Sequence, residues 1–210
     1  MTVVEESMES RDAQLNTINE MKQNGNSFFG NGEFEKAEEV YTEAIKLCPS
    51  TEVHIRSVLL SNLSAAQMKQ SKWHSAVESA TDAIKFDNNN VKALERRAFS
   101  NSNIPEKYEL AIDDYVLLQT LCEIRRTEFQ RKIEDVNQKI IERNEKLKED
   151  VVEKLKTFGN FCLKPFGLST DSFELKQGEN GGFSVQMKES QTTATTTQKP
   201  LETVETAEAE

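Results

Sequence analysis

Five hydrogen-bond donors recur at helical spacing in the first half of the chain. Lys22 and Asn26 are four residues apart, Lys92 and Arg96 are also four apart, and Asn62 lies between the two pairs. Residues four apart share one face of a helix, so each pair presents its donors together. Lys and Arg are donor-only cations and Asn adds an amide group, so this set suits an anion with several acceptor oxygens. A free C-terminal carboxylate beside an Asp side chain is such an anion.

Residues 22–49, KQNGNSFFGNGEFEKAEEVYTEAIKLCP, predict the two helices that position the first pair. Apolar residues fall at helical spacing on both sides of Asn31 and Gly32, so each helix has one buried face. Gly25 and Ala37 are small at the points where the two helices must touch. The stretch therefore predicts a helix–turn–helix hairpin with its turn at Asn31 and Gly32.

The hairpin pattern recurs twice, which predicts three repeats over residues 17–51, 57–90 and 91–123, with residues 52–56 as a short extension. The matching apolar positions of the second helices are Ala37, Tyr41, Ala44 and Ile45, then Ala76, Ala80, Ala83 and Ile84, then Ala111, Tyr115, Leu118 and Leu117. The unit resembles the tetratricopeptide repeat (TPR), a helix–turn–helix of about 34 residues. The resemblance implies an all-α TPR solenoid in which the first helix of each repeat lines a concave groove.

The five donors resemble, residue for residue, the two-carboxylate clamp of the TPR co-chaperones. In that family the clamp holds the terminal Glu-Glu-Val-Asp of the seventy- and ninety-kilodalton heat-shock chaperones. The resemblance implies that four donors hold the two carboxylates of the last residue: Lys22, Asn26, Asn62 and Lys92. Arg96 would support the upstream part of the peptide. Phe29 and Ala65, each three residues after a clamp Asn, would form the pocket for the Val of the peptide.

The alternative is that all five donors are ordinary solvated residues on exposed helices. The spacing of Lys92 and Arg96 favours the clamp, because like charges four apart slightly destabilise a helix and so indicate an external anion. We therefore predict a non-enzymatic adaptor or co-chaperone whose groove binds the acidic C-terminal peptides of heat-shock chaperones.

Residues 124–158 predict one long amphipathic helix. Its apolar positions are Ile133, Val136, Ile140, Leu147, Val151, Leu155 and Phe158. The part next to the repeats is interpreted as a cap, since the last repeat exposes an apolar face that must be covered. The stripe is also close to a heptad, so the part past Arg143 is a candidate dimerisation or partner surface.

The remaining segments are short. Residues 159–188 contain FGLS and then apolar residues that alternate on either side of a GENGG turn, which predicts a possible β-hairpin. Residues 1–14 are acidic without apolar periodicity, and residues 189–210 are mostly Thr, Glu and Lys. Both ends are predicted to be disordered, because they have little to bury.

The order of three repeats, a long charged helix and then GNFCLKPFGLSTDSFELKQ resembles the tetratricopeptide repeat protein 1 family. The likeness covers roughly residues 15–188 of this chain. That family is regarded as a set of adaptors that bind chaperones and components of small-GTPase and heterotrimeric G-protein signalling. It implies an alternative function, a signalling scaffold whose main surface is the long helix with the C-terminal segment.

Charge and residue usage argue against several other classes. The net charge of -10 disfavours nucleic acid as the main partner, because phosphate binding needs a basic surface. Cys48, Cys122 and Cys162 are odd in number and widely separated, which indicates a reducing compartment. His54 and His74 have no second ligand or triad partner at a recognisable spacing, so neither enzymatic activity, a metal nor a cofactor is predicted.

The chain contains no apolar stretch near the roughly 20 residues that span a bilayer, so membrane insertion is not predicted. Its N-terminus, MTVVEESMESRD, is acidic, and it has neither the apolar core of a secretory signal nor the Arg-rich composition of a transit peptide. We expect a cytoplasmic protein, with the nucleus left open.

Overall fold

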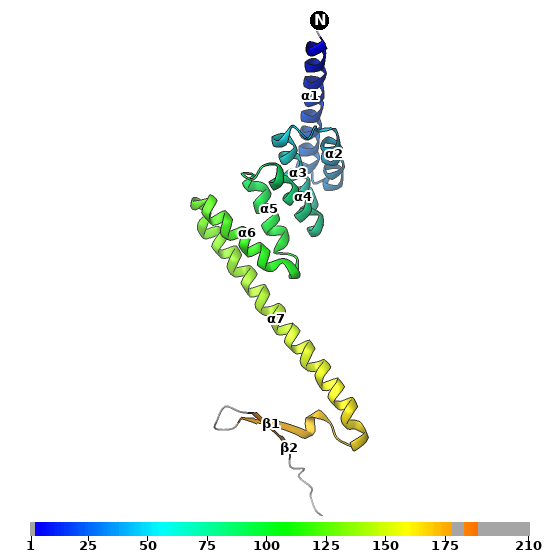
Figure 1. Ribbon diagram of the computed structural model, residues 1–210, viewed down its shortest axis with the longest axis vertical. Helices are drawn as coiled ribbons and strands as arrows, with labels where there is room; N and C mark the ends of the chain where they lie inside the picture. The colour runs from blue at the N-terminus through cyan, green and yellow to red at the C-terminus, as the bar shows by residue number, and fades with distance from the viewer. Residues whose placement is uncertain (1–2, 178–182, 189–210) are drawn as a thin grey trace, which may run out of the picture. The chain divides into compact units, whose positions relative to one another are not determined.

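The computed structural model describes residues 3–177 and 183–188, with side chains described for residues 11–174 and 184–188. The predicted disordered tail, residues 189–210, lies outside the described residues. The chain divides into two compact units, residues 1–148 and 149–210, which are described separately below. One helix, α7, runs from the first unit into the second (Figure 1).

Six helices in the first unit form three consecutive pairs, and each helix packs against the next (Figure 1). Their bounds are α1 Val3–Gly30, α2 Phe34–Leu47, α3 Val53–Lys69, α4 Trp73–Phe86, α5 Val91–Asn101 and α6 Tyr108–Leu121. The turn after α1 contains Gly32 at φ +82°, a conformation that glycine adopts without steric cost. The extension at residues 52–56 lengthens the start of α3, as the sequence predicted.

The predicted close contact between α1 and α2 is present at Gly25. A Cβ on Gly25 would lie only 2.5 Å from Cε1 of Tyr41, so the two backbones approach because this position has no side chain. Tyr41 and Ala37 are fully buried, and together with Ile18 and Leu59 they belong to one apolar core. This core joins the first repeat to the second.

Helix α7, Arg126–Leu163, begins by covering the third repeat. Phe129, Ile133 and Val136 are buried in one core with Tyr115 and Leu118 of α6, which confirms the predicted capping helix. Lys139 Nζ donates a 2.8 Å hydrogen bond to the carbonyl of Ser102, and Arg143 donates to the carbonyl of Pro105. Helix α7 therefore also holds the connection between α5 and α6.

Two helix boundaries differ from the sequence prediction. The segment 1–14, predicted to be disordered, is helical from Val3, because adding turns to an already packed helix avoids the cost of a new nucleus. The long helix was predicted to stop at Phe158, but α7 continues to Leu163. Gly159 lies inside the extended helix, where the Thr170 methyl would be 2.6 Å from an added Cβ.

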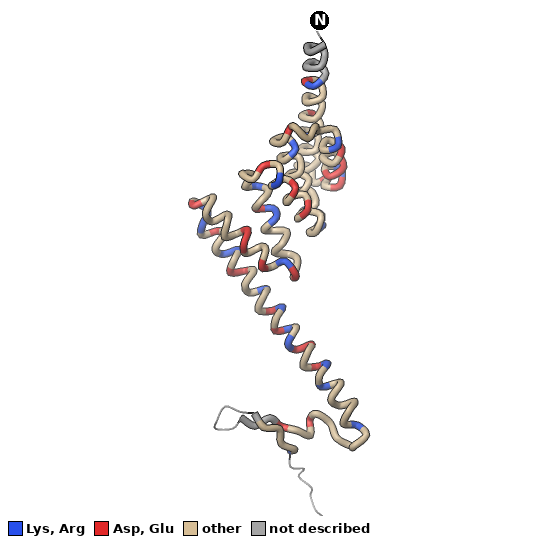
Figure 2. The backbone as a smooth tube through the Cα atoms, viewed as in Figure 1, with Lys and Arg blue, Asp and Glu red and all other residues tan. Residues whose placement is uncertain are grey.

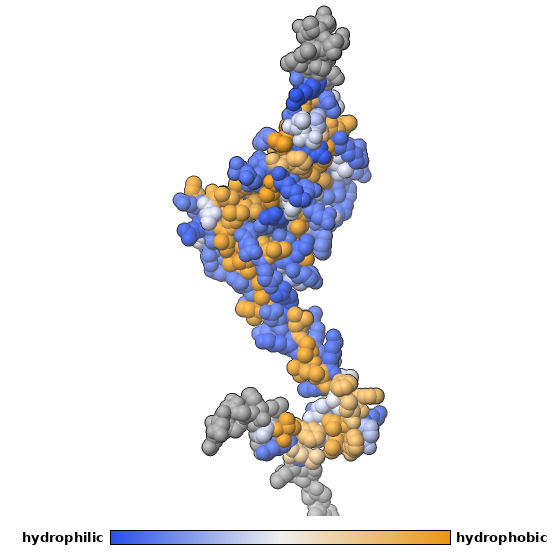
Figure 3. All heavy atoms as spheres, viewed as in Figure 1, coloured by the Kyte–Doolittle hydropathy of each residue, from blue (hydrophilic) through white to orange (hydrophobic). Residues whose placement is uncertain are grey.

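In the second unit, two short turns, η3 Lys164–Phe166 and η4 Thr170–Ser172, lead into a hairpin. Strands β1 Phe173–Gln177 and β2 Phe183–Met187 pair antiparallel with Phe173 opposite Met187, so the predicted hairpin is present. The turn itself lies outside the described residues. Large apolar side chains on the α7 part of this unit are exposed (Figure 3): Val151, Val152, Leu155, Phe158 and Phe161.

Candidate functional site

The five predicted donors lie on the first helix of each repeat, so stacking of the repeats determines how they meet. Lys22 and Asn26 lie on α1, Asn62 lies on α3, and Lys92 and Arg96 lie on α5. Figure 2 shows basic residues on α5 and acidic residues gathered on α2, the second helix of the first repeat. The negative net charge therefore does not extend evenly over the repeats.

Asn26 and Asn62 are in direct contact although they are 36 residues apart. Oδ1 of Asn26 accepts a 2.7 Å hydrogen bond from the Tyr41 hydroxyl and a 3.2 Å bond from Nδ2 of Asn62. Because both bonds use the oxygen, the amide is oriented and its Nδ2 remains a donor for other groups. Burial raises the pKa of Tyr41, which keeps its hydroxyl protonated as the donor.

Arg96 lies on the opposite wall from Asn26 and shares a pocket of about 260 Å³ with it. The pocket is lined by Asn26, Phe29, Tyr41, Asn62, Ala65 and Arg96. Arg96 donates to the hydroxyl of Ser61, and burial lowers the pKa of its guanidinium. The pocket therefore combines amide donors with a partly buried guanidinium, a set that suits an anionic ligand.

A second pocket of about 610 Å³ adjoins the first, sharing Phe29, Ala65 and Arg96. Its other lining residues are Met68, Lys69, Trp73, Lys92, Glu95, Phe99 and Lys132. Trp73 and Phe99 make an edge-to-face pair with ring centroids 5.9 Å apart. The lining of the second pocket therefore combines apolar and aromatic side chains with four basic residues and one acid.

Of the five predicted donors, Lys22 has the fewest contacts with the others in the structure. It lies one turn before Asn26, half-buried, and its Nζ donates a 2.9 Å hydrogen bond to Oδ1 of Asn19. It lines neither of the two pockets just described. The structure thus brings together Asn26, Asn62 and Arg96, places Lys92 in the adjoining pocket, and leaves Lys22 beside the group.

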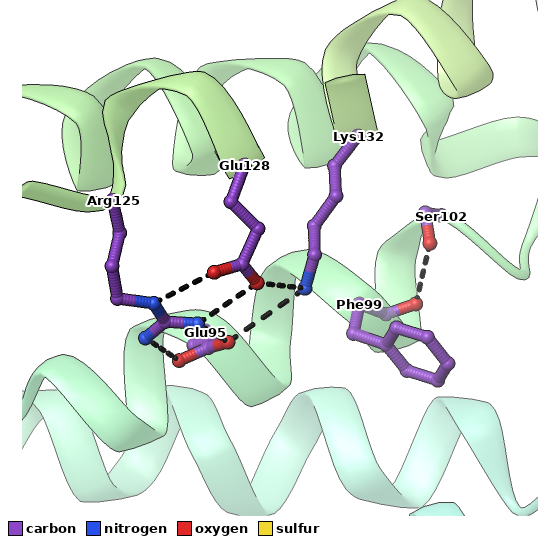
Figure 4. Close-up of polar contacts among 6 residues, drawn as sticks. All are labelled: Glu95, Phe99, Ser102, Arg125, Glu128 and Lys132. Carbon is purple, nitrogen blue, oxygen red and sulfur yellow. Dashed lines mark hydrogen bonds and ion pairs between the residues drawn. The ribbon is translucent and has the colours of Figure 1, made fainter. Parts of the chain in front are cut away.

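Glu95 is an acidic residue in the lining of the second pocket, and it is held by Arg125, just before α7, and by Lys132 of α7 (Figure 4). Arg125 makes a two-bond contact with it, Nη2 to Oε1 at 2.8 Å and Nη1 to Oε2 at 3.0 Å. Arg125 also bonds Glu128, and Lys132 Nζ lies 3.7 Å from Glu95 and 3.4 Å from Glu128. Hydrogen bonding from Arg125 lowers the pKa of Glu95, so this carboxylate stays ionised.

Several of these residues were missed from the sequence. Tyr41 was assigned to a buried stripe, although its hydroxyl signalled that a polar partner must exist. The position of Trp73 at the start of a helix indicates that its ring packs against another helix, but it does not indicate that the ring lines the groove. Lys132 lies on a helix outside the repeats, so its position depends on how α7 docks, which residue spacing does not determine.

Metal and membrane sites are not evident in the described part of the chain. There, no three His, Cys, Asp or Glu side chains are close enough to hold an ion together. None of the helices in residues 3–177 combines the length and apolar character that a transmembrane span requires.

Comparison with known proteins identifies the fold. No protein-family model matches the chain. The mitochondrial import receptor subunit TOM70 of Rattus norvegicus is 34% identical over 101 residues, covering 48% of this chain and 17% of that protein. The myosin chaperone UNC-45 from C. elegans, in complex with a Hsp90 peptide, matches with a TM-score of 0.58 and 26% identity over 67% of this chain and 16% of that chain.

A third similar structure is the second TPR domain of human RPAP3 in complex with the HSP70 peptide SGPTIEEVD. It has a TM-score of 0.50 and 26% identity, and the match covers 56% of this chain and 92% of that chain. The chain is therefore a TPR-domain protein with an all-α repeat fold. It spans less than a fifth of the length of the TOM70 relative.

Proposed function

We propose that this protein is a non-enzymatic adaptor or co-chaperone whose groove binds the acidic C-terminal peptide of heat-shock chaperones. The observation that carries the proposal is the shared pocket of Asn26, Asn62 and Arg96, with Lys92 in the adjoining pocket. Amide donors and cations together suit a chain end that carries two carboxylates.

The proposed roles follow the clamp. Lys22, Asn26, Asn62 and Lys92 bind the two carboxylates of the terminal Asp, and Arg96 binds the chain upstream. Phe29 and Ala65 line both pockets, which fits a small apolar subsite for Val. The UNC-45 and RPAP3 structures support the peptide class, since both contain a chaperone tail peptide. Lys22 would have to leave Asn19 to take part.

Two finer proposals rest on the sequence. We place the chain in the tetratricopeptide repeat protein 1 family because of the GNFCLKPFGLSTDSFELKQ segment, and in the cytoplasm because its three widely separated cysteines indicate a reducing compartment. The three proteins compared above lend no support to the alternative, a scaffold for GTPases or G-protein subunits. That alternative remains a prediction from the sequence.

Calorimetric titration of the full chain with a peptide ending in Glu-Glu-Val-Asp tests the function. We expect binding at about 10 µM or weaker, since the ordering of a free tail offsets part of the gross interaction. Lys92→Ala and Arg96→Ala should each weaken binding by at least about tenfold, because a charge-assisted bond contributes about 1.5 to 3 kcal/mol. Amidating the peptide C-terminus should have the same effect.

Lys46→Ala is the matched control, because Lys46 is an exposed lysine on α2 that pairs only with Glu43 among the contacts found in the described chain. It should leave the affinity unchanged. Wild-type affinity in Lys92→Ala and Arg96→Ala, with thermal melts intact, would reject the clamp.

A further inference from the structure

The groove contains a carboxylate, that of Glu95, which would repel an acidic peptide. Glu95 lines the larger pocket with Lys92 and Arg96, and about a quarter of its side chain is exposed. Left alone, an ionised acid at this place would oppose the negative charges of a Glu-Glu-Val-Asp tail.

Glu95 is not left alone, because Arg125 approaches it from the turn η2, Glu123–Arg125, which precedes α7. The guanidinium makes two nearly parallel bonds to the carboxylate, at 2.8 and 3.0 Å, which is the most favourable geometry for this pair. Arg125 is in turn fixed, since it bonds both oxygens of Glu128 and lies 4.8 Å from the centroid of the Phe129 ring. Phe129 is fully buried in the core.

Lys132 completes this arrangement one turn further along α7. Its ammonium lies within 4 Å of both Glu95 and Glu128 and 5.7 Å from the centroid of the Tyr115 ring. Lys132 also lines the larger pocket. The charge of the larger pocket near Glu95 therefore depends on Arg125 and Lys132, which lie outside the three repeats.

We propose that Arg125 is a positioning residue for the peptide site and acts through Glu95. Arg125 holds the Glu95 carboxylate away from the peptide and neutralises the charge of that carboxylate. The electrostatic potential in the larger pocket is then set mainly by Lys92, Arg96 and Lys132. This inference rests on the proposed function, since it concerns how the same groove accepts an acidic peptide. Arg125 itself lines neither pocket.

The test compares four chains for binding of the Glu-Glu-Val-Asp peptide at low ionic strength and 10 °C. Arg125→Ala should weaken binding about five- to twentyfold, since it releases Glu95 toward the ligand. The double variant Arg125→Ala/Glu95→Gln should recover affinity to within about twofold of wild type. The double variant Arg125→Ala/Glu128→Gln should recover nothing, because Glu128 carries the same charge but does not line the pocket. Wild type is the fourth chain.

A second readout separates a charge effect from a loss of structure. The loss in Arg125→Ala should shrink when both Glu residues of the peptide are replaced by Gln, and it should shrink in 0.5 M salt. Arg126→Ala removes the neighbouring exposed arginine and should change nothing. Circular dichroism verifies that each variant is folded at 10 °C.

The outcomes are separable from those of the main proposal. If wild type does not bind the peptide, the proposed function fails. If wild type binds but Arg125→Ala binds equally well, or if Glu95→Gln does not restore the affinity that Arg125→Ala loses, the role assigned to Arg125 is wrong while the clamp stands.

Discussion

The hydroxyl of Tyr41 donates a 2.7 Å hydrogen bond to Oδ1 of Asn26, so a residue of the hydrophobic core orients a residue of the proposed peptide groove. Tyr41 is 1% exposed, and its ring lies against Gly25 on the neighbouring helix. The same side chain thus serves packing, through its ring, and recognition, through its oxygen.

Tyr41→Phe should therefore affect binding more than its small chemical change suggests. The ring still fills the core, but Asn26 loses one of the two bonds that fix its amide. We expect a loss of about 1 kcal/mol in the free energy of unfolding and about three- to tenfold weaker peptide binding. Urea unfolding and calorimetry measure the two effects. Affinity equal to wild type would show that Asn62 alone holds the amide.

Gly25→Ala should destabilise the fold even though alanine is the better helix former. The added Cβ would lie 2.5 Å from a ring carbon of fully buried Tyr41, which has no room to move. Overpacking of this kind costs about 1 to 3 kcal/mol, against a helix gain of at most about 1 kcal/mol.

Gly30→Ala is the control for that change, because nothing lies within 4 Å of a Cβ at the end of the same helix. Its midpoint of thermal unfolding should equal or slightly exceed that of wild type. Equal stability of Gly25→Ala and Gly30→Ala would show that α1 and α2 separate more easily than their contact indicates.

Phe129→Ala should be among the most damaging single changes. The ring is 0% exposed and stacks near Tyr115 at 6.3 Å, where α7 covers the third repeat. Removing it should cost about 3 to 5 kcal/mol in the free energy of unfolding, measured by urea titration. Phe158→Ala, on the same helix but 67% exposed, should cost less than about 0.5 kcal/mol. Equal losses would mean that α7 is packed along its whole length.

Acid should weaken the junction between α5 and α7. Bonding to Arg125 lowers the pKa of Glu95, and hydrogen bonding lowers that of Glu128 to about 2. A carboxyl group whose pKa is depressed in the folded state stabilises it above the unfolded pKa, near 4.5, and loses that contribution as pH falls toward the folded value. Stability should therefore decline between about pH 4.5 and 2.

Chemical denaturation of wild type and Arg125→Ala at pH 6, 4 and 3 measures this decline. The variant starts lower at pH 6 and should fall less, because its two carboxyl groups have lost the partner that depressed their pKa. Parallel curves for the two proteins would assign the acid sensitivity to other carboxylates, such as Glu38, whose pKa is also lowered.

The sequence predicted what depends on local spacing. The helix pairs and the close approach at Gly25 follow from the recurring pattern of small and large apolar residues, because similar helix pairs stack in a similar way. The position of Glu95 against Arg125 does not follow, since 30 residues separate them and the docking of α7 determines their contact. Lys22 shows a further limit, because helical spacing puts it beside Asn26 but does not choose its partner.

Helix α7 packs over the third repeat, which carries two of the proposed clamp residues. This part of the proposed peptide groove therefore depends on a helix that contributes none of the clamp residues. Lys92 and Arg96 belong to α5, the shortest of the paired helices. Arg125 bonds Glu95 of the same helix, and Lys139 bonds the carbonyl of Ser102, the residue that follows it. A chain that ends near residue 123 would keep every proposed clamp residue and would still lose the α7 contacts that support α5, so we expect it to lose the proposed peptide binding as well.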